Sequence, residues 1–110
     1  MPQRRRTVAP APVFAALGDE NRLRLLTLLG GGQLMSISRL TAGSGISRQG
    51  VSKHLRVLAG AGLVRGSRRG KESLWQLERR RLDEARRSLD LIARQWDVSL
   101  GKLQQFVEED

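Results

Sequence analysis

Glycine residues divide the middle of the chain into short segments, and this limits what that region can fold into. Three glycines stand together at residues 30–32, and single glycines follow at positions 43, 45, 60 and 62. Glycine is unfavourable inside a helix and common where a helix ends. Asp19, Ser36 and Ser47 precede segments with helical spacing, and Asp and Ser are preferred N-cap residues. The sequence therefore predicts a succession of short capped helices.

Four such helices fit between the breaks. The first runs from about Pro12 to Gly18, and the second, "ENRLRLLTLL", occupies residues 20–29. The third is short, follows Ser36, and is expected to end at the glycines of positions 43 and 45. The fourth spans about residues 48–59.

The fourth helix has two unlike faces. Val51, Leu55 and Leu58 recur at spacings of four and three, which predicts one buried face. The other side of the helix carries only polar and basic residues: Arg48, Gln49, Ser52, Lys53 and Arg56. Gly50 stands in the first turn of this helix. This glycine either permits a closer approach to DNA or is a neutral replacement of a better helix former. We favour the neutral interpretation, because the helix penalty of glycine is small in the first turn.

A β-hairpin is predicted directly after the fourth helix. "LVRGS" and "ESLWQL" have the composition of short strands, and Arg68-Arg69-Gly70-Lys71 is expected to form the turn between them. Trp75 and Leu77 share one face of the second strand by the two-residue period, and Trp75 is most simply a core residue. A ligand pocket lined by Trp75 is the alternative.

The last third of the chain predicts one long helix, from about residue 81 to residue 107. Two series of residues recur at intervals of seven and form an a/d seam with one polar position. They are Leu82, Leu89, Trp96 and Leu103, and Ala85, Ile92, Ser99 and Phe106. A small domain cannot cover so long a seam. We expect part of it to pack on the first helix and part on a second copy of the chain.

The charge balance indicates a polyanion as partner. Twenty Lys and Arg residues against eleven Asp and Glu residues give a net charge of +9 and a sequence pI near 11.6. No acidic residue occurs between Asn21 and Lys71, so the positive charge is clustered. Clustered basic charge with a high pI is typical of nucleic-acid-binding domains. The positive charge is spread over several predicted elements. This disfavours binding to a membrane surface through one amphipathic helix.

The remaining composition predicts a soluble intracellular protein of one domain. Cysteine is absent, which excludes disulfides and suits the cytoplasm. No signal peptide or membrane-spanning segment is recognisable. Residues 1–12, rich in Pro, Ala and Arg, are expected to form a flexible basic tail before a domain at residues 13–110. Arg4, Arg5 and Arg6 are either solvated or placed along DNA.

The predicted fold class is mainly α with a small β-hairpin, a winged helix-turn-helix in the order α-α-α-α-β-β-α. Three stretches also resemble the ArsR-type winged-helix repressors, named for arsenic resistance: "FAALGDENRLRLLTLL", "SISRLTAGSGISRQGVSKHLRVLAGAGLV" and "RRGKESLWQL". The most specific part is "SRQGVSKHLRVLAGAGLV", which matches the recognition helix of that family and the turn after it. The resemblance extends from Val13 to the end of the chain.

The resemblance implies a dimeric bacterial repressor that binds operator DNA, located in the cytoplasm at the nucleoid. Members of the family pair through their first and last helices. On this chain the implied dimer interface consists of Phe14, Leu17, Leu82, Leu89, Ile92, Trp96 and Leu103. The implied partners are double-stranded DNA and a second copy of the chain.

Roles in DNA binding follow from helix geometry as well. Gln49, Ser52 and Lys53 lie near the N-terminus of the predicted recognition helix, where side chains reach base edges. Phosphate contacts are expected from the helix start and the wing, that is from Ser47, Arg48, Arg68, Arg69 and Lys71. Arg56, on the same face of the helix, completes the expected DNA-binding residues. His54 is the single histidine and lies beside this interface in the resemblance. Structural support or a phosphate contact is expected of it rather than catalysis.

The metal sites of the resembling repressors are not matched here. Ser36 and Ser38 stand where metal-sensing members carry a Cys-x-Cys pair, and hydroxyls are poor ligands for soft metals. The last helix has no histidine for the alternative site. We therefore expect no metal or cofactor, and leave open an effector that is a small molecule or a protein, or regulation by abundance alone.

Three other function classes fit the sequence less well. A largely non-specific architectural DNA-binding protein needs only the basic charge, but the mixed polar face of Gln49, Ser52 and Lys53 favours base reading. An enzyme is not indicated, because neither a nucleophile arrangement nor a phosphate-cradling loop is recognisable. RNA binding lacks an aromatic stacking surface.

Overall fold

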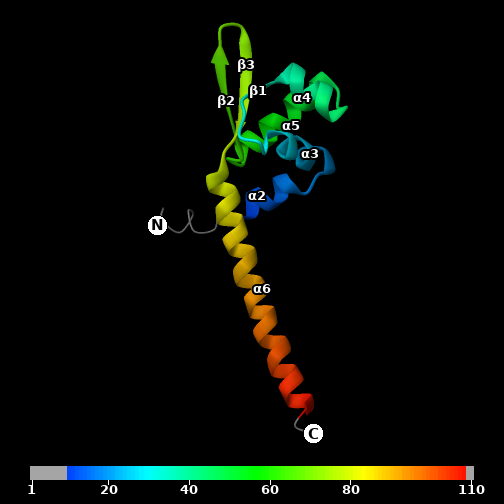
Figure 1. The fold of residues 1–110 in the computed structure, drawn as a ribbon, viewed down its shortest axis with the longest axis vertical. Coiled ribbons are helices and arrows are strands. Elements are labelled where there is room, and N and C mark those ends of the chain that lie inside the picture. Colours follow the sequence, from blue (N-terminus) through cyan, green and yellow to red (C-terminus); the bar gives the residue numbers. More distant parts are fainter. Residues whose placement is uncertain (1–9, 109–110) are drawn as a thin grey trace.

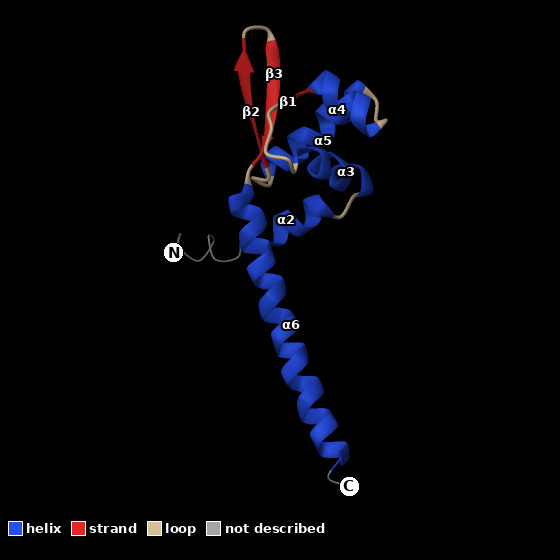
Figure 2. Cartoon of the chain, in the orientation of Figure 1, coloured by secondary structure: helices blue, strands red, loops and turns tan. Residues whose placement is uncertain are grey.

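The computed structural model describes residues 10–108, and its elements follow the predicted order with one addition (Figures 1 and 2). Residues 1–9 of the expected tail, with Arg4, Arg5 and Arg6, lie outside these residues. In chain order the elements are α2 (Pro10–Leu17), α3 (Glu20–Leu29), β1 (Met35–Ser36), α4 (Ile37–Ser44), α5 (Arg48–Gly60), β2 (Val64–Arg69), β3 (Glu72–Leu77) and α6 (Arg79–Glu108).

The three predicted N-caps are confirmed, which explains why α3, α4 and α5 begin where they do. Each capping side chain accepts a hydrogen bond from the backbone N–H three residues later. The pairs are Asp19 with Arg22 at 3.0 Å, Ser36 with Arg39 at 3.2 Å, and Ser47 with Gly50 at 3.1 Å. Such a cap satisfies an N–H group that has no partner within the helix.

Two helix boundaries differ from the prediction. α2 begins at Pro10, two residues before Pro12, so that residues 10–12 belong to a helix rather than to the tail. Proline tolerates the first turn, where its missing N–H is not needed. α4 continues through Gly43 and ends at Gly45, whose φ of 73° provides the left-handed C-cap.

The core forms where α3, α4 and α5 meet. Val51, Leu55 and Leu58 of α5 are fully buried, as their spacing predicted. They pack in one cluster with the buried side chains of Leu25, Leu29, Leu40 and Leu63. Burial of a leucine or valine side chain stabilises a fold by about 1.5–3 kcal/mol. This cluster holds the inner face of α5, and the polar face consequently points outward.

The sheet has three strands rather than the two predicted. β1 pairs with β3, so that the strand order is β1-β3-β2 and all pairings are antiparallel. β1 is only two residues long, which is too short to produce an alternating pattern in the sequence. Trp75 in β3 is half-buried against the core, in agreement with its predicted role.

The turn of the hairpin is also shorter than predicted. Arg68 and Arg69 belong to β2, and Arg69 is the Cα partner of Glu72, which leaves Gly70 and Lys71 as the turn. Gly70 has φ of +62°. Two-residue hairpin turns need a positive φ at their first central residue, and glycine adopts it without strain.

α6 extends beyond the domain that it joins (Figure 1). Its 30 residues begin beside the sheet, and Ala85 is buried against the core near α2. Beyond this contact Figure 1 shows α6 leaving the other elements as a single helix. The molecule is 69 Å long, and its radius of gyration of 18.7 Å exceeds the roughly 13 Å expected for a compact chain of this size.

The part of α6 outside the domain exposes its predicted seam. Leu89, Ile92, Trp96 and Leu103 are between 50% and 64% exposed. The side chain of Phe106 lies outside the described part of the structure. Within residues 10–108, no helix combines the length and hydropathy that a membrane span requires.

Gly62 should be essential for the connection between α5 and β2. It has φ of +79°, and a Cβ at this position would lie 2.8 Å from Cγ of Arg81. We expect Gly62→Ala to lower the free energy of unfolding by about 1–2 kcal/mol, because a non-glycine residue is strained in that conformation. Urea unfolding followed by circular dichroism measures the change.

Gly60→Ala is the matched control two residues earlier. Nothing lies within 4 Å of a Cβ at Gly60, and this residue is helical. Alanine there should be neutral or stabilising by up to about 1 kcal/mol. Equal destabilisation by both substitutions would contradict the role assigned to Gly62.

Candidate nucleic-acid interface

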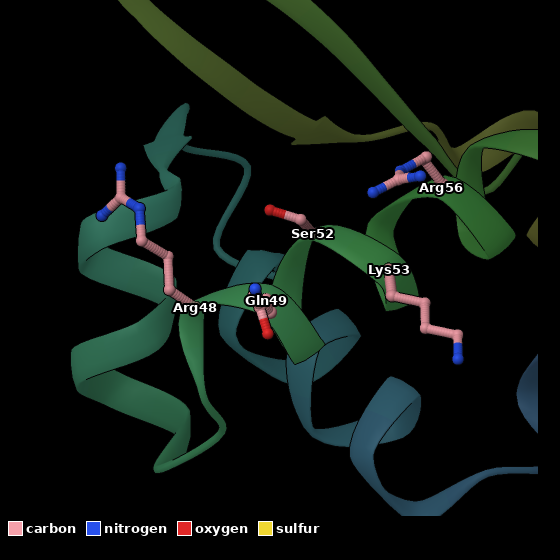
Figure 3. Close-up of a pocket in the computed structure, with 5 residues that line it drawn as sticks. All are labelled: Arg48, Gln49, Ser52, Lys53 and Arg56. Carbon is pink, nitrogen blue, oxygen red and sulfur yellow. The ribbon is translucent and has the colours of Figure 1, made fainter.

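The outward face of α5 gathers five of the predicted DNA-binding residues around one shallow hollow of about 520 Å³. The lining residues are Arg48, Gln49, Ser52, Lys53 and Arg56, and Figure 3 shows all five side chains. Ser52 is half-buried and the other four are exposed. Because the described lining contains no acid, the hollow has the charge and the hydrogen-bonding groups to contact a polyanion.

A tight connection sets the angle between α4 and α5. Gly45 ends α4, the backbone N–H of Ile46 donates to Oγ of Ser44 at 3.2 Å, and Ser47 caps α5. Ile46 packs against the core from within this connection. The apolar face of α5 and its first turn are therefore both fixed in position. A helix that enters a DNA groove needs such a fixed position.

Gly50 is not the neutral position that we expected. A Cβ there would lie 2.9 Å from Cγ2 of Ile46 and 3.1 Å from Oγ of Ser47. Alanine would have to displace one of the residues that build the connection before α5. Close packing of the first turn therefore accounts for glycine at this position.

The hairpin of β2 and β3, which is the predicted wing, carries its predicted cations at its exposed end. Arg68, Arg69 and Lys71 are all exposed, and none of them forms an ion pair within residues 10–108. Lys71 shares a second, smaller hollow with Arg48. Arg68 and Arg69 line neither of these two hollows, so their exposure alone makes them available to DNA.

His54 lies in a contact that the sequence gave no reason to expect. Nη1 of Arg22 is 3.4 Å from Nδ1 of His54, and Nε of Arg22 donates to the carbonyl of Ala16 at 2.6 Å. Arg22 also approaches Asp19 at 3.9 Å. One arginine thus joins the end of α2, the start of α3 and the recognition helix α5. This contact favours the structural role for His54.

Asp19, which lies beside Arg22 in this contact, has a lowered pKa. The backbone N–H of Arg22 donates to its carboxylate and lowers the pKa of Asp19 below the ordinary 3.8, and the positive charge of Arg22 acts in the same direction. The carboxylate is therefore the favoured form in the folded protein.

The positions that replace the Cys-x-Cys pair serve other purposes here. Oγ of Ser36 caps α4, and Oγ of Ser38 accepts a hydrogen bond from Nη1 of Arg48 at 2.9 Å. Among the residues that the structure describes, no three His, Cys, Asp or Glu side chains come together as a metal site would require.

Comparisons with known proteins identify this arrangement. A helix-turn-helix domain family matches residues 17–67, which contain α3, α4 and α5. An ArsR-like transcriptional regulator from Rhodococcus sp. RHA1 has a similar structure with a TM-score of 0.76 and 37% sequence identity, over 89% of this chain and 92% of that chain. The chain belongs to the ArsR family of transcriptional regulators.

Two further solved structures have the same winged helix-turn-helix fold as this ArsR-family chain. One is the homodimeric DNA-binding domain of a possible ArsR-family regulator from Mycobacterium bovis, with a TM-score of 0.62 and 25% identity over 84% of this chain and 82% of that chain. The other is the transcriptional repressor BigR from Xylella fastidiosa, with a TM-score of 0.63 and 25% identity over 83% and 90%. No curated protein matched the sequence.

Family membership establishes that this is a DNA-binding transcription regulator, and the predicted fold class is confirmed. In the ArsR fold of this chain, the helix-turn-helix is α4 and α5, and the wing is the hairpin of β2 and β3.

Asp19 should make the stability of the fold dependent on pH in acid. Because its pKa is lower in the folded than in the unfolded chain, the carboxylate stabilises the fold above pH 3.8. This contribution should disappear as the pH falls through the lowered pKa. Asp19→Asn keeps a side-chain acceptor for the cap but removes the charge. We therefore expect it to be less stable than the native chain at pH 7, with the difference narrowing toward pH 3.

Urea unfolding of both chains at intervals between these pH values measures the difference. A difference that stayed constant with pH would mean that Asp19 acts through its cap geometry alone, and not through its charge.

Proposed function

We propose that this chain is a homodimeric transcriptional repressor that reads an inverted-repeat operator in the cytoplasm. The observation that carries the proposal is the outward face of α5, where residues with amide, hydroxyl and ammonium groups line one hollow without an acid. A relative described as a transcriptional repressor supports the direction of regulation.

Base reading is assigned to the first two turns of α5. Gln49 can pair in bidentate fashion with adenine, Lys53 can donate to guanine, and Ser52 suits either base. These side chains come from a helix whose position is fixed by buried Val51 and Leu55. A helix held in this way presents the three side chains in one fixed arrangement, which a matching set of base edges can satisfy and a wrong set cannot.

Phosphate binding is assigned to the cations around this face. Arg56 and the wing residues Arg68, Arg69 and Lys71 are exposed, and Arg48 stands with Ser47 at the start of α5. Such contacts fix the register of a protein on the duplex and give affinity without sequence preference. A net charge of +9 supports association with DNA in general.

Dimerisation is assigned to α6 together with α2. Phe14, Leu17 and Leu82 already pack partly on the core of their own chain, whereas the later seam residues have no cover within residues 10–108. A homodimeric relative of the same fold supports a second copy as the cover. Two recognition helices related by a two-fold axis would meet half-sites about 34 Å apart.

We expect no regulation of this chain through the metal sites of the family. Ser36 and Ser38 lack the thiolates that soft metals require, and both hydroxyls already accept hydrogen bonds. An effector of another kind, small molecule or protein, is compatible with this chain.

Selection of bound duplexes from a random DNA pool at near-physiological salt tests the proposal. We expect enrichment of an inverted repeat. Binding without an enriched sequence would instead support the second candidate, a largely non-specific architectural protein, which the high net charge alone would explain.

Lys53 and Arg69 should differ in what they contribute to DNA binding. Lys53→Ala should relax base preference at one position of each half-site by about 1–3 kcal/mol. Arg69→Ala should weaken binding to all duplexes alike and reduce the slope of log K against log salt by about one unit. Titrations of operator and scrambled duplexes at several salt concentrations measure both effects. Identical behaviour of the two variants would contradict the assigned division of roles.

Trp96 should be required for dimerisation. It is 64% exposed in the single chain, and each copy would bury it in the dimer. We expect Trp96→Lys to raise the dimer dissociation constant about 100-fold or more, because two side chains each lose roughly 1.5–3 kcal/mol of apolar burial. Sedimentation equilibrium measures the constant.

Gly101→Lys adds the same charge on the opposite side of α6. Nothing lies within 4 Å of a Cβ at Gly101, and position 101 faces away from the a/d seam. This control should remain dimeric. A dimer that tolerated Trp96→Lys equally well would show that the interface lies elsewhere.

A further inference from the structure

A small polar hollow lies between the start of α4, the start of α5 and the wing. It measures about 140 Å³ and is lined by Ser36, Ile37, Ser38, Arg48, Lys71, Glu72 and Ser73. Three segments that are distant in the sequence therefore contribute to it. The lining is almost entirely hydroxyl groups and charged groups, which excludes an apolar ligand.

The donors in this hollow suit an oxyanion. Arg48 and Lys71 supply positive charge from α5 and from the hairpin turn, and Ser73 supplies a hydroxyl from β3. Hydrogen bonds from charged donors to an anionic oxygen are the strong ones. At about 30 Å³ for each water, the hollow holds between four and five waters, which is enough for one central atom with four oxygens.

Arg48 is already held in place for such a ligand. Figure 3 shows its side chain extending along α4, away from Lys53 and Arg56, and Nη1 donates to Oγ of Ser38 at 2.9 Å. Because Oγ of Ser38 accepts this bond, its own hydrogen can be donated to a ligand. A cation that is ordered before binding loses less side-chain entropy when an anion arrives.

One acid opposes the anion. Glu72 is part of the lining, so that two cations and one carboxylate leave a net charge of +1 in the hollow. Arg69 is the Cα partner of Glu72 across the hairpin, but the two side chains form no ion pair within residues 10–108. α4 also begins at this hollow, and a helix N-terminus favours an anion. The cations and hydroxyls around this one space are the groups that would bind the anion, and the helix terminus only adds to their effect.

We propose that this hollow binds one tetrahedral oxyanion, a phosphate group or a sulfate. The group can come from a backbone phosphate of bound DNA or from a free inorganic anion. Occupation by a backbone phosphate rests on the phosphate contacts that the proposed function assigns to Arg48 and Lys71. Occupation by a free anion does not, because it can be measured on the protein without DNA.

Titration of the full-length chain with inorganic phosphate tests the site. ¹H–¹⁵N spectra are recorded while phosphate replaces chloride at constant ionic strength, so that general screening stays the same. We expect saturable shifts of the amides of residues 36–39 and 71–73. Shifts spread over all basic surfaces in proportion to phosphate would overturn the proposal.

Variants make the test specific. Arg48→Gln should weaken phosphate binding about tenfold or more, since a hydrogen bond from a charged donor is lost, and Ser38→Ala should weaken it less. Glu72→Gln should strengthen it, because the opposing carboxylate is removed. Arg39→Gln is the matched control, an exposed arginine of α4 outside the lining, and should leave binding unchanged. Equal losses in the Arg48 and Arg39 variants would also overturn the site.

Competition with DNA distinguishes the two sources of the anion. If a backbone phosphate occupies the hollow, inorganic phosphate should displace a duplex from the native chain more effectively than chloride at equal ionic strength. Ser38→Ala should reduce this excess. If the natural ligand is a free anion, phosphate should bind to the protein–DNA complex without displacing the duplex.

Discussion

Burial of the inner face of α5 is the interaction on which the rest of the structure depends. Val51, Leu55 and Leu58 are fully buried, and they lock the rotation of the helix about its own axis. That rotation determines which side chains face outward, and therefore determines that Gln49 and Lys53 stand together. A loss of packing in this cluster would lower the free energy of unfolding. It would also allow the DNA-facing side chains of α5 to move, because the same contacts fix the helix.

The sequence was sufficient to predict features that depend only on residues close together in the chain. Caps are read within three residues and a buried helix face within eight, and both were correct for α5, including the N-cap Ser47. Contacts between distant segments were missed. β1 exists because Met35 and Ser36 meet β3, and Arg22 reaches His54 across 32 residues of chain. Neither has a periodic pattern, so only the folded chain could place them.

α6 is a helix whose outer part has little support from its own chain. Helices in proteins gain most of their stability from tertiary packing rather than from propensity, and isolated helices are marginal in water. Ala85 is buried against the domain, but Leu89, Ile92 and Trp96 are half or more exposed. The later seam residues that the heptad spacing predicted are therefore exposed in the described part of α6. In the proposed dimer, a second copy would cover them with the same residues on both sides.

Arg48 connects the two hollows, because it lines both the outward face of α5 and the small space beside the wing. Its guanidinium cannot serve both fully, since one hydrogen bond already directs it toward Ser38. An anion in the smaller hollow would strengthen that orientation and change the charge presented to DNA. By thermodynamic linkage, DNA binding would alter the affinity for the anion by the same factor. If the smaller hollow binds an anion, this single side chain at the start of α5 would couple the recognition surface to the wing.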